Sequence, residues 1–317
     1  MTGIWTMGEM LVEIMRPESG IPFYETGEFL GPFPSGAPAI FIDTAARLGM
    51  SAGMIGGVAE DDFGKCIIDR LVSNGVNVEY VERFPNCSTA VAFITYFEDG
   101  SREYIFHIDN TPAVMPTFNQ DIAVEKPSFF HVMGCSLMAN EQFRNEIIQA
   151  VEYFHANGAR ISFDPNIRVE LLGDETLMEV IGAVMEKTAV LLPGESELQL
   201  ISGESDMDLA AESLFDQSLL EVIVLKQGKE GAVIYTRDTR LKVPSFPVEE
   251  VDPTGAGDCF DAGFLVGILQ GKSLQECGKI AAAAGALNTA AFGPMEGKIS
   301  PDSIAELINR QPNRSEK

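Results

Sequence analysis

The segment from Val251 to Gly271 reads VDPTGAGDCFDAGFLVGILQG and is the most informative stretch of the chain. A turn-rich part with two glycines leads into a largely apolar run, which predicts a helix from about Asp258 to Gly271. Glycines at positions 255 and 257 let the backbone approach a ligand and point N–H groups at it. The positive end of the helix dipole lies at the same place. The segment therefore predicts an anion site formed by the amides of residues 255–257.

Asp258 stands beside this predicted anion site. A carboxylate there can accept the proton of an attacking hydroxyl, as phosphoryl transfer requires. An aspartate at a helix start can also be a simple N-cap. The Gly-Ala-Gly directly before it and the apolar helix directly after it favour the catalytic interpretation.

From Phe129 onward, short apolar runs alternate with helical stretches. This alternation predicts βαβ units and an α/β fold with a mostly parallel central sheet flanked by helices. Ligands of such sheets bind beyond the carboxyl ends of the strands. The predicted strands are 129–133, 160–163, 189–192, 222–225 and 232–235, the predicted helices include 141–157 and 208–218, and polar clusters follow at 164–168, 194–197 and 226–228.

The first hundred residues mix strand and loop signals. Two β-rich runs, 90–97 and 102–108, are joined at Asp99-Gly100, a strong hairpin signal. Both faces of this hairpin carry apolar side chains, so we expect a ligand or a second subunit to cover each face. Upstream, the pattern predicts a strand-like run at 4–15, a loop at 31–38, a helix at 39–48 and a strand at 52–58.

Charge and composition exclude several kinds of partner. The formal net charge is -25, which argues against nucleic acid and anionic membranes. No apolar run reaches about 18 residues, so no membrane span is expected. Glu9 and Glu13 interrupt the apolar N-terminus, which does not resemble a signal peptide. The five cysteines are scattered without a C-x-x-C pair, which favours reduced thiols and a cytoplasmic location.

The run DPTGAGDCFDAGF at 252–264 resembles the C-terminal signature of the ribokinase (PfkB) family of carbohydrate kinases. Other landmarks of that family follow in the expected order, so the resemblance covers nearly the whole chain. They are Gly8-Glu9, Ser35-Gly36-Ala37-Pro38-Ala39 with Arg47-Leu48-Gly49, Asp62-Phe63-Gly64, and the D-x-N-x-R pattern of Asp164, Asn166 and Arg168. The resemblance implies a ribokinase-like kinase domain over residues 1–310, with a small β-lid formed by about 12–30 and 88–110, and a polar tail at 311–317.

The same resemblance implies roles for individual residues. Asp258 would be the catalytic base, with Gly255, Ala256 and Gly257 as the anion hole and Arg168 near the substrate or phosphates. Glu197 would lie near Mg²⁺. Asp252 would lie near the phosphates or near a monovalent cation such as K⁺. The implied sugar contacts are Glu13, Ser35, Gly36, Ala37, Tyr104, Phe106 and Asp258, and the implied ATP contacts are Asn166, Glu197, Lys226, Gly228, Gly231, Asp252, Thr254, Gly255, Gly257 and Asn288.

Several of these residues have an ordinary structural alternative. Arg168 could form a surface ion pair, and Glu197 could be a helix-start charge that complements the dipole. Lys226 could be a solvated lysine at a strand end. Asn288 could be a polar residue on a helix surface, and His107 in the lid is more readily structural than catalytic.

Three positions depart from the family pattern. Ile40 stands where relatives often carry an Asn that binds a sugar hydroxyl, and Gly194 replaces the Asn of the N-x-x-E pattern before Glu197. Acid-sugar kinases of the family tend to carry Arg near the end of the second lid strand, where this chain has Ile108 and Asp109. An acidic residue there should repel a sugar carboxylate, so we favour a neutral sugar.

The sequence therefore predicts an ATP- and Mg²⁺-dependent sugar kinase, and the run GPFPSGAPAIFID resembles kinases of the tagatose and fructose type. The alternatives are a 2-keto-3-deoxygluconate or nucleoside kinase on the same fold, or a catalytically silent sugar-sensing protein. A homodimer through the β-lid is expected as well, because the second lid face needs a cover.

Overall fold

The chain builds one large sheet and one small sheet. The structure, a computed structural model, describes residues 3–120, 122, 127–167, 175–217 and 219–310. The predicted tail at 311–317 and Arg168 lie outside these residues. Within them, the large sheet has the strand order β13-β12-β11-β10-β9-β8-β1-β4-β5. Its strands are β1 (Gly3–Met7), β4 (Ser51–Ala59), β5 (Val76–Phe84), β8 (Phe129–Met133), β9 (Arg160–Asp164), β10 (Thr188–Leu191), β11 (Val222–Lys226), β12 (Ala232–Tyr235) and β13 (Arg240–Val243).

Every pairing from β5 across to β11 is parallel, and only β12 and β13 are antiparallel. The central strands are buried along their whole length, as in the FFHVM run of β8. Strands covered on both faces read as continuous apolar runs rather than as alternating ones. The predicted mostly parallel α/β fold is confirmed.

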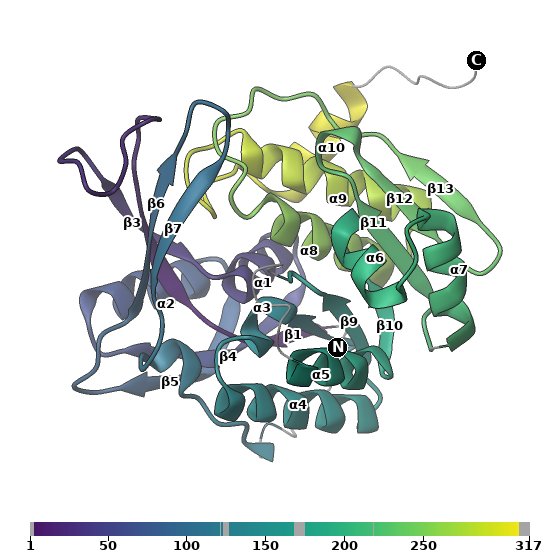
Figure 1. Ribbon diagram of the computed structural model, residues 1–317, viewed down its shortest axis with the longest axis horizontal. Coiled ribbons are helices and arrows are strands. Elements are labelled where there is room, and N and C mark those ends of the chain that lie inside the picture. The colour runs from purple at the N-terminus through teal and green to yellow at the C-terminus, as the bar shows by residue number, and fades with distance from the viewer. Residues whose placement is uncertain (1–2, 121, 123–126, 168–174, 218, 311–317) are drawn as a thin grey trace.

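Helices cover both faces of the large sheet and create two apolar cores (Figure 1). One core contains residues of α1 (Ala37–Arg47), α2 (Asp62–Ser73), α8 (Ala256–Leu269), α9 (Leu274–Thr289) and α10 (Pro301–Arg310). The other contains residues of α3 (Gly134–Leu137), α4 (Glu141–Ala156), α5 (Glu175–Met185), α6 (Glu195–Ser202) and α7 (Met207–Gln217). Two short 3-10 turns, η1 (Pro112–Val114) and η4 (Gly228–Glu230), complete the described elements. None of the described helices is long and apolar enough to cross a membrane.

The small sheet has the order β3-β2-β6-β7 and stands to one side of the main body (Figure 1). It consists of β2 (Leu11–Met15), β3 (Leu30–Ser35), β6 (Ala90–Tyr96) and β7 (Arg102–His107), and we call it the lid. The predicted hairpin is confirmed, because β6 and β7 pair antiparallel from Val91 opposite His107 to Tyr96 opposite Arg102.

Two expectations for the N-terminal part were wrong. The run 31–38 was expected to be a loop, but residues 30–35 form the edge strand β3. Pro32 and Pro34 can belong to it because an edge strand has one side that needs no ladder hydrogen bonds. The single strand-like run 4–15 splits into β1 and β2, which belong to different sheets. The break occurs at Gly8, where a Cβ atom would lie 2.3 Å from Pro38 Cγ.

Candidate active site

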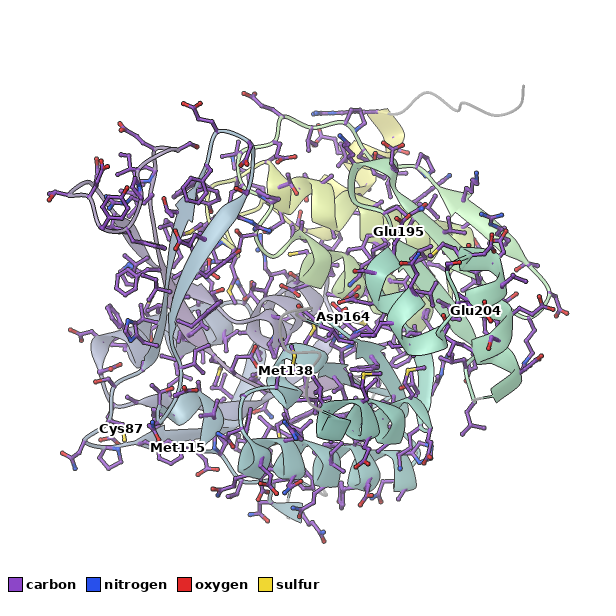
Figure 2. The ribbon with its side chains drawn as sticks, viewed as in Figure 1. Cys87, Met115, Met138, Asp164, Glu195 and Glu204 are labelled. Atoms are coloured by element: carbon purple, nitrogen blue, oxygen red, sulfur yellow. The ribbon has the colours of Figure 1, made fainter. Side chains whose placement is uncertain are left out.

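A cavity of about 620 Å³ lies at the carboxyl ends of the parallel strands, under the lid. Figure 2 places two of its lining residues, Met138 and Asp164, near the centre of the molecule. Many predicted site residues line it. The sugar-side residues are Glu13, Ser35, Gly36, Ala37, Tyr104 and Phe106, and the remaining ones are Asn166, Glu197, Lys226, Thr254, Gly255, Gly257 and Asp258. The fold thus brings together residues more than 200 positions apart in the chain.

Asp258 lies in the first turn of α8, with its side chain against the cavity and only 8% of its surface exposed. Burial, followed by the charge of Asp164, raises the pKa of Asp258 to about 8. Lys226 opposes this shift, whereas Glu9 and Glu13 add to it. A carboxyl whose pKa lies near the working pH can take a proton during a reaction and release it afterwards.

The turn before Asp258 contains residues 255–257, the predicted anion hole, which we call the cradle. Gly255 is the N-cap of α8 with φ 76°, and a Cβ atom there would lie 2.6 Å from Pro294 O, so only glycine fits. Gly255 and Gly257 line the main cavity. The N–H of Ala256 instead donates to Pro253 O at 3.2 Å, and Ala256 lines a second cavity. The helix begins two residues earlier than predicted, at Ala256.

The sugar side of the cavity is rich in carboxylates. Glu13 accepts a hydrogen bond from Ser35 Oγ at 2.7 Å, and burial raises the pKa of Glu13 to about 7. Glu9 accepts hydrogen bonds from the side chains of Cys135 and Ser136. Tyr104 and Phe106 are stacked, with ring centroids 5.3 Å apart. Carboxylates beside flat aromatic faces suit a polyol, whose hydroxyls donate to oxygen and whose C–H groups pack on the rings.

The lid is tied to the turn that precedes α8. Tyr96 Oη donates to Asp252 Oδ1 at 3.0 Å, and Arg102 Nη1 donates to Thr254 Oγ1 at 3.0 Å. Asp252 is fully buried and also accepts from Thr254 N, Thr254 Oγ1 and Gly293 N. These four donors hold Asp252 and the turn in shape. The role of Asp252 near the phosphates or a monovalent cation stays a prediction.

A second cavity of about 510 Å³ lies on the other side of the cradle. The predicted ATP residues Lys226, Gly228 and Gly231 line it, together with Phe246, Ala282 and Ala286 among others. Lys226 and Gly257 border both cavities. The apolar walls of the second cavity suit a flat heterocycle, and Ala256 and Gly257 of the cradle also line it. Such a cavity suits a nucleotide.

Asn288 does not line either cavity. It is fully buried, and its Nδ2 donates to Thr254 O at 2.7 Å and to Pro294 O at 3.1 Å. Neighbouring Gly285, Ala286 and Thr289 line the second cavity instead. Asn288 therefore supports the cradle from behind, and the structure does not bring it to a nucleotide.

Glu197 is the better-placed candidate for Mg²⁺. It lines the main cavity, and its carboxylate caps α6 by accepting from Gly194 N at 2.6 Å and from Ile167 N at 2.8 Å. Glu197 thus lies in the first turn of α6, as its structural alternative expects, and it also lines the cavity, so its role near Mg²⁺ stays a prediction. Among the described residues, no three carboxylate, histidine or cysteine side chains form a metal cluster. Mg²⁺ in kinases commonly takes only one or two carboxylates, together with substrate phosphates, so the residues fit.

Two cavity residues, Arg102 and Cys135, received no assignment from the sequence. Glu9 and Asp164 were named only as parts of family patterns, and Asp109 only as an acidic residue near the sugar. Glu9 stands two residues after β1 and Asp164 ends β9, so both lie at the carboxyl ends of strands, where ligands of such sheets bind. Asp261, one turn after Asp258, gives no signal of its own inside an apolar helix.

This fold and this site define a carbohydrate kinase, and the chain belongs to the pfkB family of carbohydrate kinases, whose family model matches residues 23–300. It is accordingly a phosphotransferase that acts on a sugar hydroxyl. The predicted family is confirmed.

Individual relatives agree with this assignment. "Probable fructokinase-5" of Arabidopsis thaliana is 30% identical, over 96% of this chain and 97% of its own. The crystal structure of a "putative Ribokinase II in complex with ATP and Mg+2" from E.coli is 37% identical, with a TM-score of 0.93, over 98% of this chain and 100% of that one. A fructokinase double mutant from Vibrio cholerae O395, bound to fructose, ADP and potassium ion, shares the fold at 24% identity and a TM-score of 0.83, over 97% and 98%.

Proposed function

We propose that this chain transfers the γ-phosphoryl group of ATP to a hydroxyl of a neutral sugar, a ketohexose such as fructose or tagatose. The observation that carries the proposal is the position of Asp258, whose buried carboxyl faces the sugar-side cavity at the mouth of the glycine cradle. The names of the relatives, fructokinase and an ATP-bound kinase, support the same substrates.

Each of these residues has its own role in the proposed reaction. Asp258 takes the proton of a primary hydroxyl while that oxygen bonds to the γ-phosphorus and the bond to the ADP oxygen breaks. The amides of Gly255 and Gly257 and the N-terminus of α8 stabilise the negative charge in transit. Glu197 and the phosphates would hold Mg²⁺, which would supply further positive charge. The lid excludes water, which limits wasteful hydrolysis of ATP.

The charge of the cavity supports a neutral sugar over a sugar acid. Among the residues the structure describes, two cations, Arg102 and Lys226, line this cavity against six carboxyl side chains, those of Glu9, Glu13, Asp109, Asp164, Glu197 and Asp258. A carboxylate on the substrate would meet like charges at short range, which is costly in a partly dehydrated site. A 2-keto acid is therefore the weaker alternative.

A substrate panel tests this function. Ketohexoses, aldohexoses, nucleosides and 2-keto-3-deoxygluconate are each supplied with Mg-ATP, and ADP release is measured. We expect a ketohexose to have the highest kcat/KM. Asp258→Asn should lower kcat by roughly 10²–10⁴-fold while ATP affinity stays nearly intact. A preference for a nucleoside or a keto acid would refute the sugar assignment, near-normal turnover of Asp258→Asn would refute the base, and sugar binding without ADP formation would indicate a sensor.

We also propose that two copies associate through the lid. Ile105 on β7 is 41% exposed and Leu30 on β3 is 36% exposed, both high for large apolar side chains. A second copy would cover them, since apolar area removed from water stabilises association. Light scattering after size exclusion should give twice the monomer mass, and Ile105→Asp should reduce it toward the monomer. A wild-type monomer at high concentration would contradict this assembly.

A further inference from the structure

Lys226 occupies the point where the two cavities meet. It is the last residue of β11 and lines both cavities. Its Nζ lies 2.8 Å from Asp164 Oδ2 and 3.1 Å from Asp261 Oδ2, and the three side chains are 18%, 4% and 0% exposed. One buried ammonium thus bridges two buried carboxylates that come from different elements, β9 and α8.

Stability alone is a weak reason to keep such a cluster. The free energy needed to remove these charges from water offsets much of their mutual attraction. Apolar residues of the same size often stabilise a fold equally well. Asp261 is a costly member, because its Oδ1 is buried without a hydrogen-bond partner among the described residues. Buried polar groups left incompletely satisfied in a native fold call for a functional explanation.

The geometry supplies that explanation. An ammonium group has three N–H donors, and Asp164 and Asp261 receive two of them. A Cβ atom on Gly257 would lie 3.9 Å from Lys226 Nζ, with nothing closer. The ammonium therefore stands directly beside the cradle, on the path between nucleotide and sugar, with one donor left for a ligand oxygen.

The family resemblance already implies that Lys226 contacts ATP. We propose that Asp261 is the positioning residue of this contact, and that together with Asp164 it holds the ammonium beside the transferring phosphoryl group. The inference rests on the proposed function only in taking ATP as the donor. Lys226 stays protonated throughout. As the sugar oxygen bonds to phosphorus, the hydroxyl proton goes to Asp258 and the electron pair of the broken bond leaves on ADP, while Lys226 stabilises the charge on the phosphoryl oxygens.

Asp261 is the more informative of the two carboxylates for a test. Asp164 lines the main cavity and could also meet a ligand, whereas Asp261 is fully buried and lines neither cavity. A change at Asp261 therefore reaches a bound phosphate through its neighbours, and Lys226 is the cation that it accepts a hydrogen bond from.

The experiment compares ATP with ADP, which differ only by the group that Lys226 is proposed to contact. Calorimetry in the presence of Mg²⁺ measures both affinities for wild type, Lys226→Met, Lys226→Arg and Asp261→Asn. We expect Lys226→Met to weaken ATP binding by about 10-fold or more and ADP binding by less than about 3-fold. Asp261→Asn should shift the ATP-to-ADP ratio in the same direction by a smaller factor and lower kcat by about 10-fold, with the sugar KM unchanged. Lys226→Arg should keep part of the preference because it keeps the charge.

The matched controls are Lys65→Met and Asp69→Asn, which alter an exposed ion pair on α2. Both should leave the ratio at the wild-type value. Equal weakening of ATP and ADP, or an unchanged ratio accompanied only by a lower melting temperature, would overturn the proposal. If Lys226→Met does not fold, Asp261→Asn and Lys226→Arg decide by the same ratio. A wild type that binds ATP but phosphorylates no sugar would refute the proposed function and leave this comparison valid.

Discussion

At the scale of single residues, the chemistry depends on how the surroundings alter ordinary side chains. Burial and the neighbouring Asp164 raise the pKa of Asp258 to about 8. Lys226 shows the opposite balance. Burial alone lowers its pKa, yet Asp164, Asp261 and Glu197 more than offset that effect and raise it, so the ammonium stays charged. The site thus places a proton acceptor, Asp258, and a permanent cation, Lys226, beside the cradle.

The pH dependence of kcat/KM follows from Asp258. A base must be deprotonated to act, and a raised pKa means that the carboxyl is largely protonated below that value. We expect kcat/KM to rise by up to about 10-fold per pH unit below pH 8 and to level off above it. The charges that face this carboxyl are Glu9, Glu13, Asp164 and Lys226.

The measurement is kcat/KM between pH 6 and 9 at saturating Mg²⁺. The residual activity of Asp258→Asn serves as the control, because that variant lacks the titrating group and should lose the rising limb. A wild-type profile that is flat over this range would show that Asp258 is not the group that titrates.

At the scale of elements, the N-terminus of α8 is the decisive piece. Gly255 and Gly271 flank this helix and both have positive φ, 76° and 70°. Alanine at either position should cost about 1 kcal/mol for the left-handed backbone. Only Gly255→Ala also places a Cβ atom against Pro294 O at 2.6 Å, whereas nothing lies within 4 Å of such an atom at Gly271. We therefore expect Gly255→Ala to lose more stability and at least about 10-fold in kcat.

Thermal unfolding and steady-state kinetics of the two variants check this pair. Gly271→Ala should lose a few degrees of melting temperature and keep wild-type turnover. Similar kinetics in both variants would mean that the shape of the cradle does not limit the reaction.

The elements also show how far the sequence could predict the structure. The alternating runs after Phe129 gave the parallel strands correctly, because strands buried on both faces carry an unbroken apolar signal. The strand at 30–35 was missed, since its Gly and Pro content is typical of a loop and only the neighbouring β2 determines its pairing. Signature residues such as Gly255 and Asp258 were located in advance. Asp261 was not, because its importance arises from a contact with Lys226, which lies 35 positions away in the chain, rather than from a local pattern.

At the scale of the whole molecule, a net charge of -25 surrounds a site for a polyanion. On the proposed function, this field repels ATP at long range, whereas the cradle, Lys226 and Mg²⁺ would attract it at short range. Salt screens the long-range part first, since the Debye length falls from about 30 Å at 0.01 M to about 10 Å at 0.1 M.

We therefore expect the KM for ATP to fall by about 2–5-fold when the ionic strength rises from 0.01 to 0.1 M at constant free Mg²⁺. A neutral sugar has no net charge to screen, so its KM should change by less than about 2-fold and provides the internal control. A KM for ATP that rises with salt would show that local cations, and not the overall field, govern nucleotide capture.

The bonds from Tyr96 and Arg102 to the turn at 252–254 have a consequence for how this protein can diversify. The lid strands are hydrogen-bonded to the same turn that leads into the cradle. The sugar and phosphate ends of the site therefore cannot change independently of each other. New sugar preferences can arise by exchanging side chains such as Tyr104 or Asp109, which take no part in those two hydrogen bonds. Substitutions of Tyr96 or Arg102 would loosen the lid and would also allow transfer of the phosphoryl group to water.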